Sequence, residues 1–156
     1  MENVCGRCMY HIEVEGVNFK CTIFDPNNRI SRYIYSQEII DRELSKYVEK
    51  IKDGSALGRF NPPLLGEYGE HYPTFFEISP LNCAFEVTNL SRKEDGSWEV
   101  EGCTLKTPYG GILKSLLVSE VGMKPTLTGI GSVDENDVVG DNFSLIAIDI
   151  MPEDTK

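Results

Sequence analysis

The segment "KPTLTGIGSV", residues 124–133, raises the main question of chemistry in this chain. It places the hydroxyl groups of Thr126 and Thr128 two residues apart, just before two glycines. A threonine hydroxyl becomes an effective nucleophile only when a neighbouring base takes its proton. The chain contains two histidines, His11 and His71, as candidate bases. The first question is therefore whether a histidine lies against the hydroxyl of Thr126.

Metal chemistry would rest on "CGRC", residues 5–8, which has the ligand spacing of a zinc site. His11 and Cys21 are the residues that would complete four ligands. No second CxxC follows, and the alternation after Met9 is typical of a strand, which points neighbouring residues to opposite faces. We therefore expect no metal and no other cofactor, and free thiols at all five cysteines.

Length and charge limit the classes of protein to consider. A chain of 156 residues predicts one domain over residues 1–156, with a frayed terminus over residues 1–9. Fifteen basic residues against twenty-five acidic ones leave a net charge of -10, which repels phosphate backbones. We expect no nucleic-acid binding, and a basic protein surface is the natural complement of such a charge.

Hydropathy predicts no contact with a membrane. The chain has no run of about 18 apolar residues of the kind that spans a bilayer. Its first twenty residues lack the apolar core of a signal peptide. We therefore expect a soluble, intracellular protein.

The first half of the chain shows strand and helix patterns in turn. Alternation over residues 10–24, with Gly16 at the turn, predicts a pair of strands. The clearest helix covers residues 37–53, with Ser36 as its N-cap and Gly54 after its end. The following stretch, rich in proline, glycine and aromatic residues, is expected to be loop.

The second half adds a hairpin, a short helix and two strands. Residues 83–105 alternate on both sides of "EDG", the expected hairpin turn. A break at "TPYGG" precedes a short helix over residues 112–121, and strands are expected over residues 127–133 and 142–150. These elements predict an α+β fold: an antiparallel, barrel-like β core flanked by two or more helices.

The order of these segments resembles the prohead core proteases of T-even-like tailed bacteriophages. Those proteases begin with an Asn/Arg-rich turn ending in tyrosine, a helix and a "GELNHP"-like loop. A hairpin and a "G-x-x-L" helix follow. The last landmarks are an "S-S-R-G-x-G" strand and a strand ending in a "V-D"-type dipeptide. The matching stretches here are "NNRISRYIYS", the helix over residues 37–53, "ALGRFNPP", "ISPLNCAFEVTNL" through "VEGCTLKTPYGG", "PTLTGIGS" and "FSLIAID". The likeness runs from about Val17 to Asp149.

The resemblance implies a fold like that of the herpesvirus assembly protease. Members of the family cleave scaffold and capsid precursors. The family uses a serine nucleophile and a histidine base. Its serine falls on Thr126, and its arginine, which helps to hold the oxyanion, falls on Thr128. Its histidine has no counterpart, because Asn61 is followed directly by Pro62. We therefore expect no working catalytic residues at these degenerate positions. Asp149 falls on a family aspartate and is expected to serve as a cap for the chain terminus, with a remnant third catalytic member as the alternative.

One alternative keeps the chain an enzyme. The segment after "NPP" is longer than in the family and carries His71, which would have to fold back to within about 3 Å of Thr126 to act as its base. This would make an active capsid-maturation peptidase with a Thr126–His71 pair. A loop histidine that bonds locally or faces solvent is the commoner situation.

The leading hypothesis is a pseudoprotease that acts by binding proteins during phage head assembly, or as part of the virion. Its expected partners are phage capsid or scaffold proteins, with self-association as a further option, and its expected location is the host cytoplasm during infection or the virion. A regulator or decoy that binds a host protein or an active protease paralogue shares this logic. The candidate anchors for a partner are the aromatic residues Phe60, Tyr68, Tyr72, Phe75 and Phe76, which equally well roof the core.

Overall fold

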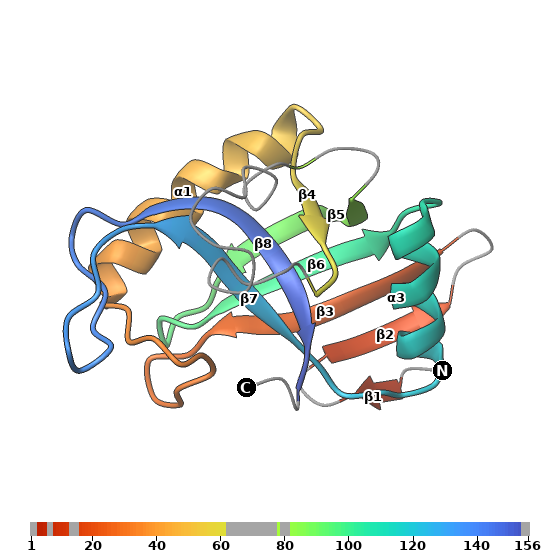
Figure 1. Ribbon diagram of the computed structural model, residues 1–156, viewed down its shortest axis with the longest axis horizontal. Coiled ribbons are helices and arrows are strands. Elements are labelled where there is room, and N and C mark those ends of the chain that lie inside the picture. The colour runs from red at the N-terminus through yellow and green to blue at the C-terminus, as the bar shows by residue number, and fades with distance from the viewer. Residues whose placement is uncertain (1–2, 6–7, 13–15, 62–77, 79–81, 154–156) are drawn as a thin grey trace.

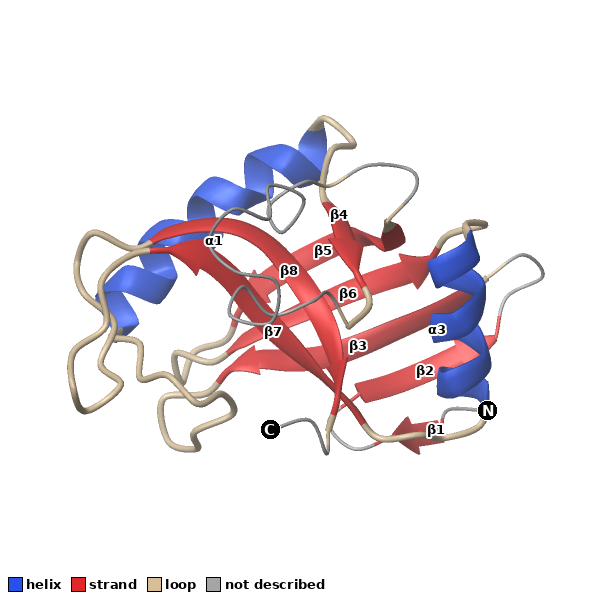
Figure 2. Ribbon diagram, in the orientation of Figure 1, coloured by secondary structure: helices blue, strands red, loops and turns tan. Residues whose placement is uncertain are grey.

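The computed structural model describes residues 3–5, 8–12, 16–61, 78 and 82–153. Its strands form two antiparallel sheets, and two helices, α1 and α3, lie beside them (Figure 1). Figure 2 shows α1 along one side of the larger sheet and α3 across one of its ends. The predicted α+β class is confirmed.

The larger sheet has six strands in the order β1-β2-β3-β6-β5-β4. Two hairpins dominate it, because β2 pairs with β3 and β5 pairs with β6. The hairpin expected around "EDG" is confirmed, with Val87 opposite Gly102 and Leu90 opposite Val100. The strand bounds are β1 Asn3–Cys5, β2 Cys8–Ile12, β3 Val17–Phe24, β4 Leu57–Arg59, β5 Cys83–Arg92 and β6 Trp98–Thr104.

The smaller sheet is a two-stranded ribbon that crosses over one face of the larger sheet (Figure 1). It consists of β7, Met123–Ile130, and β8, Ser144–Pro152. A single parallel bridge between Phe60 and Ile150 joins the two sheets just after β4. The expected barrel is not found, since the described strands form no closed barrel: β4 has only three residues, and its pairing with β5 shifts at Gly58/Arg59.

Helix α1, Gln37–Lys52, agrees with the prediction from sequence. Ser36 caps it by accepting a hydrogen bond from the backbone N–H of Ile39 at 3.1 Å. Gly54 follows the C-terminal end with a φ of 79°, a conformation that favours glycine. The apolar stripe of the helix, including Leu44 and Tyr47, is buried against the sheets.

Polar side chains on the other part of α1 bind the start of β8. The Glu43 carboxylate accepts a hydrogen bond from the backbone N–H of Leu145 at 2.9 Å, and Arg42 donates to the carbonyl of Phe143 at 2.8 Å. Burial works to raise the pKa of Glu43, but hydrogen bonds from Leu145, Arg42 and Lys46 outweigh it and hold the pKa below its ordinary value. These contacts fix where β8 begins relative to α1.

Helix α3, Pro108–Val118, begins earlier than expected. "TPYGG" was expected to break the chain, but it forms the N-terminal turn: Thr107 caps the helix through the N–H of Gly110 at 2.9 Å, and Pro108 takes the first helical position. Gly110 is required there, because a Cβ at that position would lie 1.9 Å from the carbonyl oxygen of Leu105. The helix ends at Val118, before Gly122.

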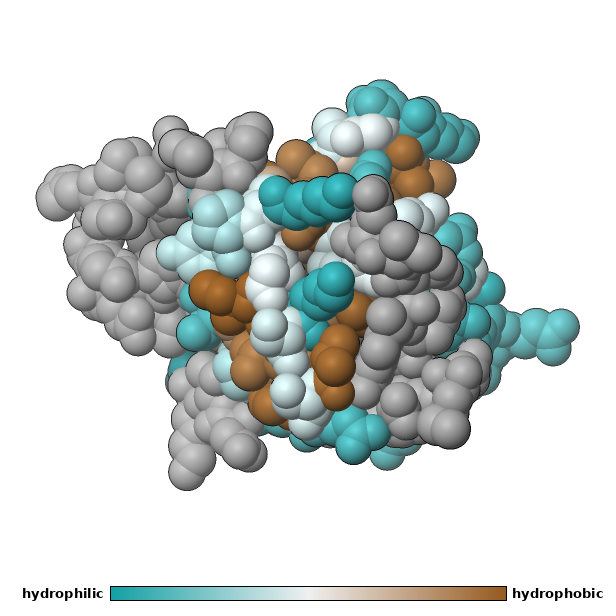
Figure 3. Space-filling view, turned by 90° about the vertical axis from the view of Figure 1, so that its right-hand side faces the viewer, coloured by the Kyte–Doolittle hydropathy of each residue, from teal (hydrophilic) through white to brown (hydrophobic). Residues whose placement is uncertain are grey.

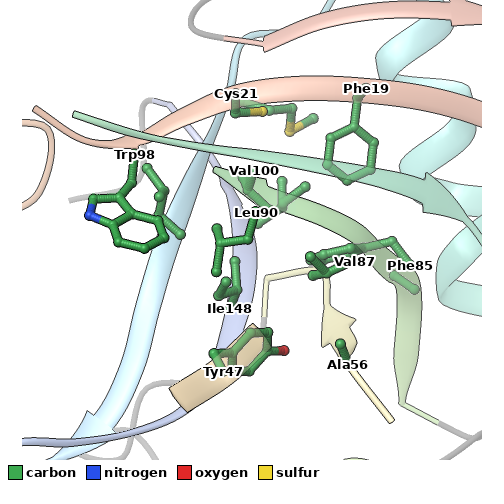
Figure 4. Packing of buried hydrophobic residues seen from close by; sticks show 14 of the residues in the cluster. Phe19, Cys21, Tyr47, Ala56, Phe85, Val87, Leu90, Trp98, Val100 and Ile148 are labelled. Carbon is green, nitrogen blue, oxygen red and sulfur yellow. The ribbon is translucent and has the colours of Figure 1, made fainter. Parts of the chain in front are cut away.

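The main core lies between the six-stranded sheet, the β7–β8 ribbon and α1. Figure 4 shows Phe19, Val87 and Val100 of the sheet lying toward Ile148 of β8, with Tyr47 of α1 at the edge of the same cluster. All of these side chains are at least nine-tenths buried. The ribbon is therefore held over the sheet mainly by apolar burial.

The N-terminal part of the chain differs from expectation. Residues 1–9 were expected to fray, but Asn3–Cys5 and Cys8–Ile12 form strands, because the alternation continues through "CMYHI" and pairs with β3. Among the helices of the described residues, none is long and apolar enough to cross a membrane.

The two adjacent glycines of α3 provide a matched test of this packing. We predict that Gly110→Ala lowers the free energy of unfolding by about 1–3 kcal/mol or more, because its Cβ meets the Leu105 carbonyl. Gly111→Ala is expected to raise it by about 0.5–1 kcal/mol, because a Cβ there meets nothing within 4 Å. Urea unfolding followed by circular dichroism measures both, and equal effects at the two positions would contradict the placement of α3.

Candidate functional site

The two threonines of "KPTLTGIGSV" lie in β7, next to Asp149 of β8. Thr126 is directly opposite Asp149 in the antiparallel register, so the two side chains share one face of the ribbon. Thr128, two residues further along β7, lies on the same face. The structure therefore brings together three positions that the resemblance singled out.

The carboxylate of Asp149 is fully buried and accepts four hydrogen bonds from described residues. Its Oδ1 accepts from the backbone N–H of Arg59 at 2.9 Å and from Arg59 Nε at 3.1 Å. Its Oδ2 accepts from Arg59 Nη2 at 2.8 Å and from the Thr128 hydroxyl at 2.6 Å. A carboxylate offers about four lone-pair sites, so these donors fill its capacity. Asp149 is 0% exposed and Arg59 is 2% exposed.

Arg59 reaches Asp149 because β4 lies against β8 without a side chain between them. Gly58 precedes Arg59, and a Cβ at Gly58 would lie 2.4 Å from the carbonyl oxygen of Ile148 and 2.1 Å from the ring of Phe85. The shift in β4–β5 pairing at Gly58/Arg59 then turns the Arg59 N–H toward β8. Glycine and bulge together place the guanidinium on the carboxylate.

The position that the resemblance matches to the family's histidine falls at the turn that follows β4. Asn61 has a φ of 48°, and its backbone N–H donates to the carbonyl of Ile150 at 2.8 Å. Asparagine is one of the few residues that adopt this left-handed conformation readily. Asn61 is exposed, two residues after Arg59 in the chain. Pro62 lies outside the described residues.

The Thr126 hydroxyl differs from its neighbour, because Thr126 makes no side-chain hydrogen bond within the described residues. Its side chain is half-buried on the same face as Asp149. His71 lies outside the described residues, and His11 is described only as part of β2. The described side chains therefore supply no imidazole to Thr126.

Tyr47 of α1 lies close to the same carboxylate. Burial raises the pKa of Tyr47 well above its ordinary value, and the negative charge of Asp149 raises it further. The phenol therefore stays neutral throughout the physiological range. Tyr47 was expected only as part of the packing stripe of the helix, and its position next to Asp149 depends on how α1 crosses β8.

A pocket of about 430 Å³ lies on the other face of β7. Pro125 and Leu127, which alternate with Thr126 and Thr128 along the strand, contribute to its lining. Its opposite wall comes from residues 23–37, including Arg29 and Tyr35. The pocket does not include Thr126, Thr128, Asp149 or Arg59, so it is separate from the hydroxyl groups.

The remaining predicted residues divide between described and undescribed parts of the chain. Phe60 is partly buried and packs against the main core, while Tyr68, Tyr72, Phe75 and Phe76 lie outside the described residues. Among the described residues, no group of three or more His, Cys, Asp or Glu side chains is arranged to hold a metal. The expectation of free thiols is wrong for Cys21, which is disulfide-bonded, whereas Cys83 and Cys103 form no disulfide. Spacing in the sequence did not reveal that β2 pairs alongside Cys21.

Asp149 corrects the sequence-based view in one further respect. It was expected to serve as a cap for the chain terminus, but it lies in the interior, paired with Arg59. Arg59 was not identified from the sequence as a partner of Asp149, because "LGRF" was predicted to be loop. One signal was available: an aspartate in the apolar run "LIAIDI" must find a counter-charge if the strand is buried.

Fold and site together define an α+β protein whose described residues form two helices and antiparallel sheets, and in which a buried ion pair joins the smaller sheet to β4. No protein-family model matches the chain, and no curated protein matches it significantly. Among solved structures, the chain is similar to the capsid assembly protease gp21 of bacteriophage T4, with a TM-score of 0.69. The match covers 87% of this chain and 81% of gp21 at 16% identity, and at this identity it shows the fold.

The two threonines form a matched pair for measuring what the carboxylate contributes. We predict that Thr128→Val lowers the free energy of unfolding by about 1.5–3 kcal/mol, because a buried charge loses a hydrogen bond while the side-chain shape is kept. Thr126→Val should change it by less than about 0.5 kcal/mol, since no hydrogen bond to a described residue is lost. Chemical denaturation of both variants checks this, and a larger cost at Thr126 would show that its hydroxyl has a strong partner.

Proposed function

We propose that this chain is a phage head-assembly protein with a prohead-protease fold that binds other proteins and does not cleave them. The fold supports the assembly context, because it resembles a capsid assembly protease. The positions matched to the family's serine, arginine and histidine carry Thr126, Thr128 and the Asn61–Pro62 step. Its partners in this proposal are phage capsid or scaffold proteins.

The state of Asp149 is the observation that carries the proposal. An aspartate that assists a histidine base must accept a hydrogen bond from the imidazole. Asp149 already accepts four, from Arg59 and Thr128, and it is buried away from solvent. It therefore has no lone pair left with which to orient a base beside Thr126.

The rate argument points the same way. In serine proteases, loss of the nucleophile or of the base lowers turnover on the order of 10⁴ to 10⁶-fold, and the losses are not additive. The methyl group of threonine adds crowding at the hydroxyl, because a β-branched side chain is stiff at χ1. Without a base, the Thr126 hydroxyl is expected to be inert toward peptide bonds on the timescale of head assembly.

The direct test incubates the purified chain with capsid and scaffold precursors from the phage that encodes it. We predict stable binding to at least one precursor and no cleavage, followed by gel electrophoresis and intact mass. Thr126→Ala is the matched control, and it should bind as the parent chain does. Cleavage that disappears in Thr126→Ala would overturn the proposal.

The peptidase alternative makes a different prediction for chemical labelling. If His71 activated Thr126, a hydroxyl-reactive phosphonate would label Thr126, and His71→Ala would abolish the labelling. We expect no label at Thr126 in either protein. Pull-down from infected cells distinguishes the remaining versions of the binding role, because a regulator or decoy would capture a host protein or a protease paralogue instead of capsid precursors.

A further inference from the structure

Three cysteines occupy one row across three neighbouring strands. Cys5 of β1 is directly opposite Cys8 of β2, and Cys8 is directly opposite Cys21 of β3. Residues that are opposite each other in antiparallel strands share one face of the sheet. Cys21 is 1% exposed, and Figure 4 shows it on the same side of β3 as Phe19, toward the core. All three cysteine positions are therefore on the core face of the sheet.

The disulfide partner of Cys21 follows from which cysteines remain. Cys21 is disulfide-bonded, while Cys83 and Cys103 form no disulfide. The chain contains five cysteines, so the remaining candidates within it are Cys5 and Cys8. Neighbouring strands lie about 4.8 Å apart, which places Cys5, two strands away, about 10 Å from Cys21. A disulfide spans Cα atoms about 4.4–6.8 Å apart, so Cys8 is the partner that the register allows.

The hydrogen-bond pattern of β3 favours this link. The backbone N–H of Val17 donates to the hydroxyl of Thr104 in β6 at 3.0 Å, so it points away from β2. Alternate residues of a strand direct their N–H groups to the same side, and Cys21 is four residues after Val17. The pair of Cys8 and Cys21 is therefore a non-hydrogen-bonded pair. In such pairs the Cα atoms are about 4.5 Å apart and the side chains are closest.

We propose that Cys5, Cys8 and Cys21 form a thiol–disulfide exchange site, in which Cys8 bonds to Cys21 at rest and can pass to Cys5. A small disulfide such as oxidised glutathione first oxidises the thiols of Cys8 and Cys21 and is itself reduced to two thiols. The Cys5 thiolate then attacks the sulfur of Cys8, and the bond from Cys8 to Cys21 breaks. Cys21 leaves as a thiolate and takes up a proton, so this second step involves no net oxidation.

The surroundings of the row determine which state prevails. Cys5 and Cys8 form a Cys-X-X-Cys motif, and this spacing increases the thiolate fraction of the attacking cysteine. Cys21 is buried among apolar side chains, where a thiolate loses its hydration and is a poor leaving group. We therefore expect the link to Cys21 to predominate. Because Cys21 is inaccessible to an external thiol, exchange starts from the Cys5 side.

The position of the link gives it a structural effect. The pair of Cys8 and Cys21 is the last of five pairs between β2 and β3, at the end remote from the connection over residues 13–16. Helix α3 lies over the end of the sheet that contains this connection, and hydrophobic and weakly polar residues gather over α3 there (Figures 1 and 3). The disulfide therefore fixes the end of β2 that no connection holds. Once Cys8 passes to Cys5, no covalent bond holds this end of β2 to β3.

Peptide mapping tests the pairing directly. Trypsin cleaves after Arg7, Lys20 and Arg29, so the three cysteines fall on separate peptides: residues 1–7, 8–20 and 21–29. The full chain is equilibrated with oxidised glutathione, alkylated in acidic denaturant, digested and analysed by mass spectrometry. We expect peptide 8–20 joined to peptide 21–29, with Cys5 alkylated in most molecules. A link between peptides 1–7 and 21–29, or an alkylated Cys21, would overturn the proposal.

Reduction kinetics test the exchange step. The oxidised, native chain is treated with dithiothreitol, and loss of the link to Cys21 is followed by the same mapping. Cys5→Ser should slow this loss at least about tenfold, because it removes the attacking thiolate. Cys103→Ser is the matched control: Cys103 forms no disulfide, and its register partner Asn18 is on the opposite face of β3 from Cys21. It should be reduced at the rate of the parent chain.

A third variant tests the alternative bond. In oxidised Cys21→Ser, peptide 1–7 should be joined to peptide 8–20, because Cys5 is then the neighbour of Cys8. Circular dichroism compares the fold of every variant with that of the parent chain. Equal reduction rates in the parent chain and Cys5→Ser, or no link from Cys5 to Cys8 in Cys21→Ser, would overturn the exchange step. None of these results depends on whether Thr126 is reactive, so they are separate from the test of the proposed function.

Discussion

The buried pair between Arg59 and Asp149 is the polar constraint that fixes where the β7–β8 ribbon meets β4, while apolar burial provides most of the attraction between the two sheets. Removing two charges from water costs several kcal/mol per ion, and only good geometry with further hydrogen bonds repays that cost. Here the carboxylate receives two guanidinium donors, a backbone N–H and the Thr128 hydroxyl. Because Arg59 lies in the larger sheet and Asp149 in the ribbon, the pair also fixes how the two sheets meet.

This structural role of Asp149 explains why the two threonine hydroxyl groups of β7 differ in hydrogen bonding. Thr128 is bound to the carboxylate, and Thr126, directly across from it, forms no side-chain hydrogen bond within the described residues. A catalytic carboxylate needs a lone pair that faces its histidine, whereas a structural one is better the more donors it binds. The four hydrogen bonds at Asp149 suit a structural carboxylate, and they leave no lone pair to face a histidine. The same residue thus holds the fold together and leaves Thr126 without help from it.

Local sequence signals predicted those elements that local physics determines. Ser36, the apolar stripe and Gly54 defined α1 to within a residue, and the alternation around "EDG" defined the β5–β6 hairpin. The prediction of a chain break at "TPYGG" was wrong, because it gave more weight to the two glycines than to the N-cap threonine and the proline that begin α3. Arg59 could not be placed from sequence, since its role depends on Gly58 touching β8, 90 residues further along the chain. The prediction of a closed barrel was wrong for a similar reason. Closure requires pairing between strands far apart in the sequence, and β4, with three residues, is too short to continue it.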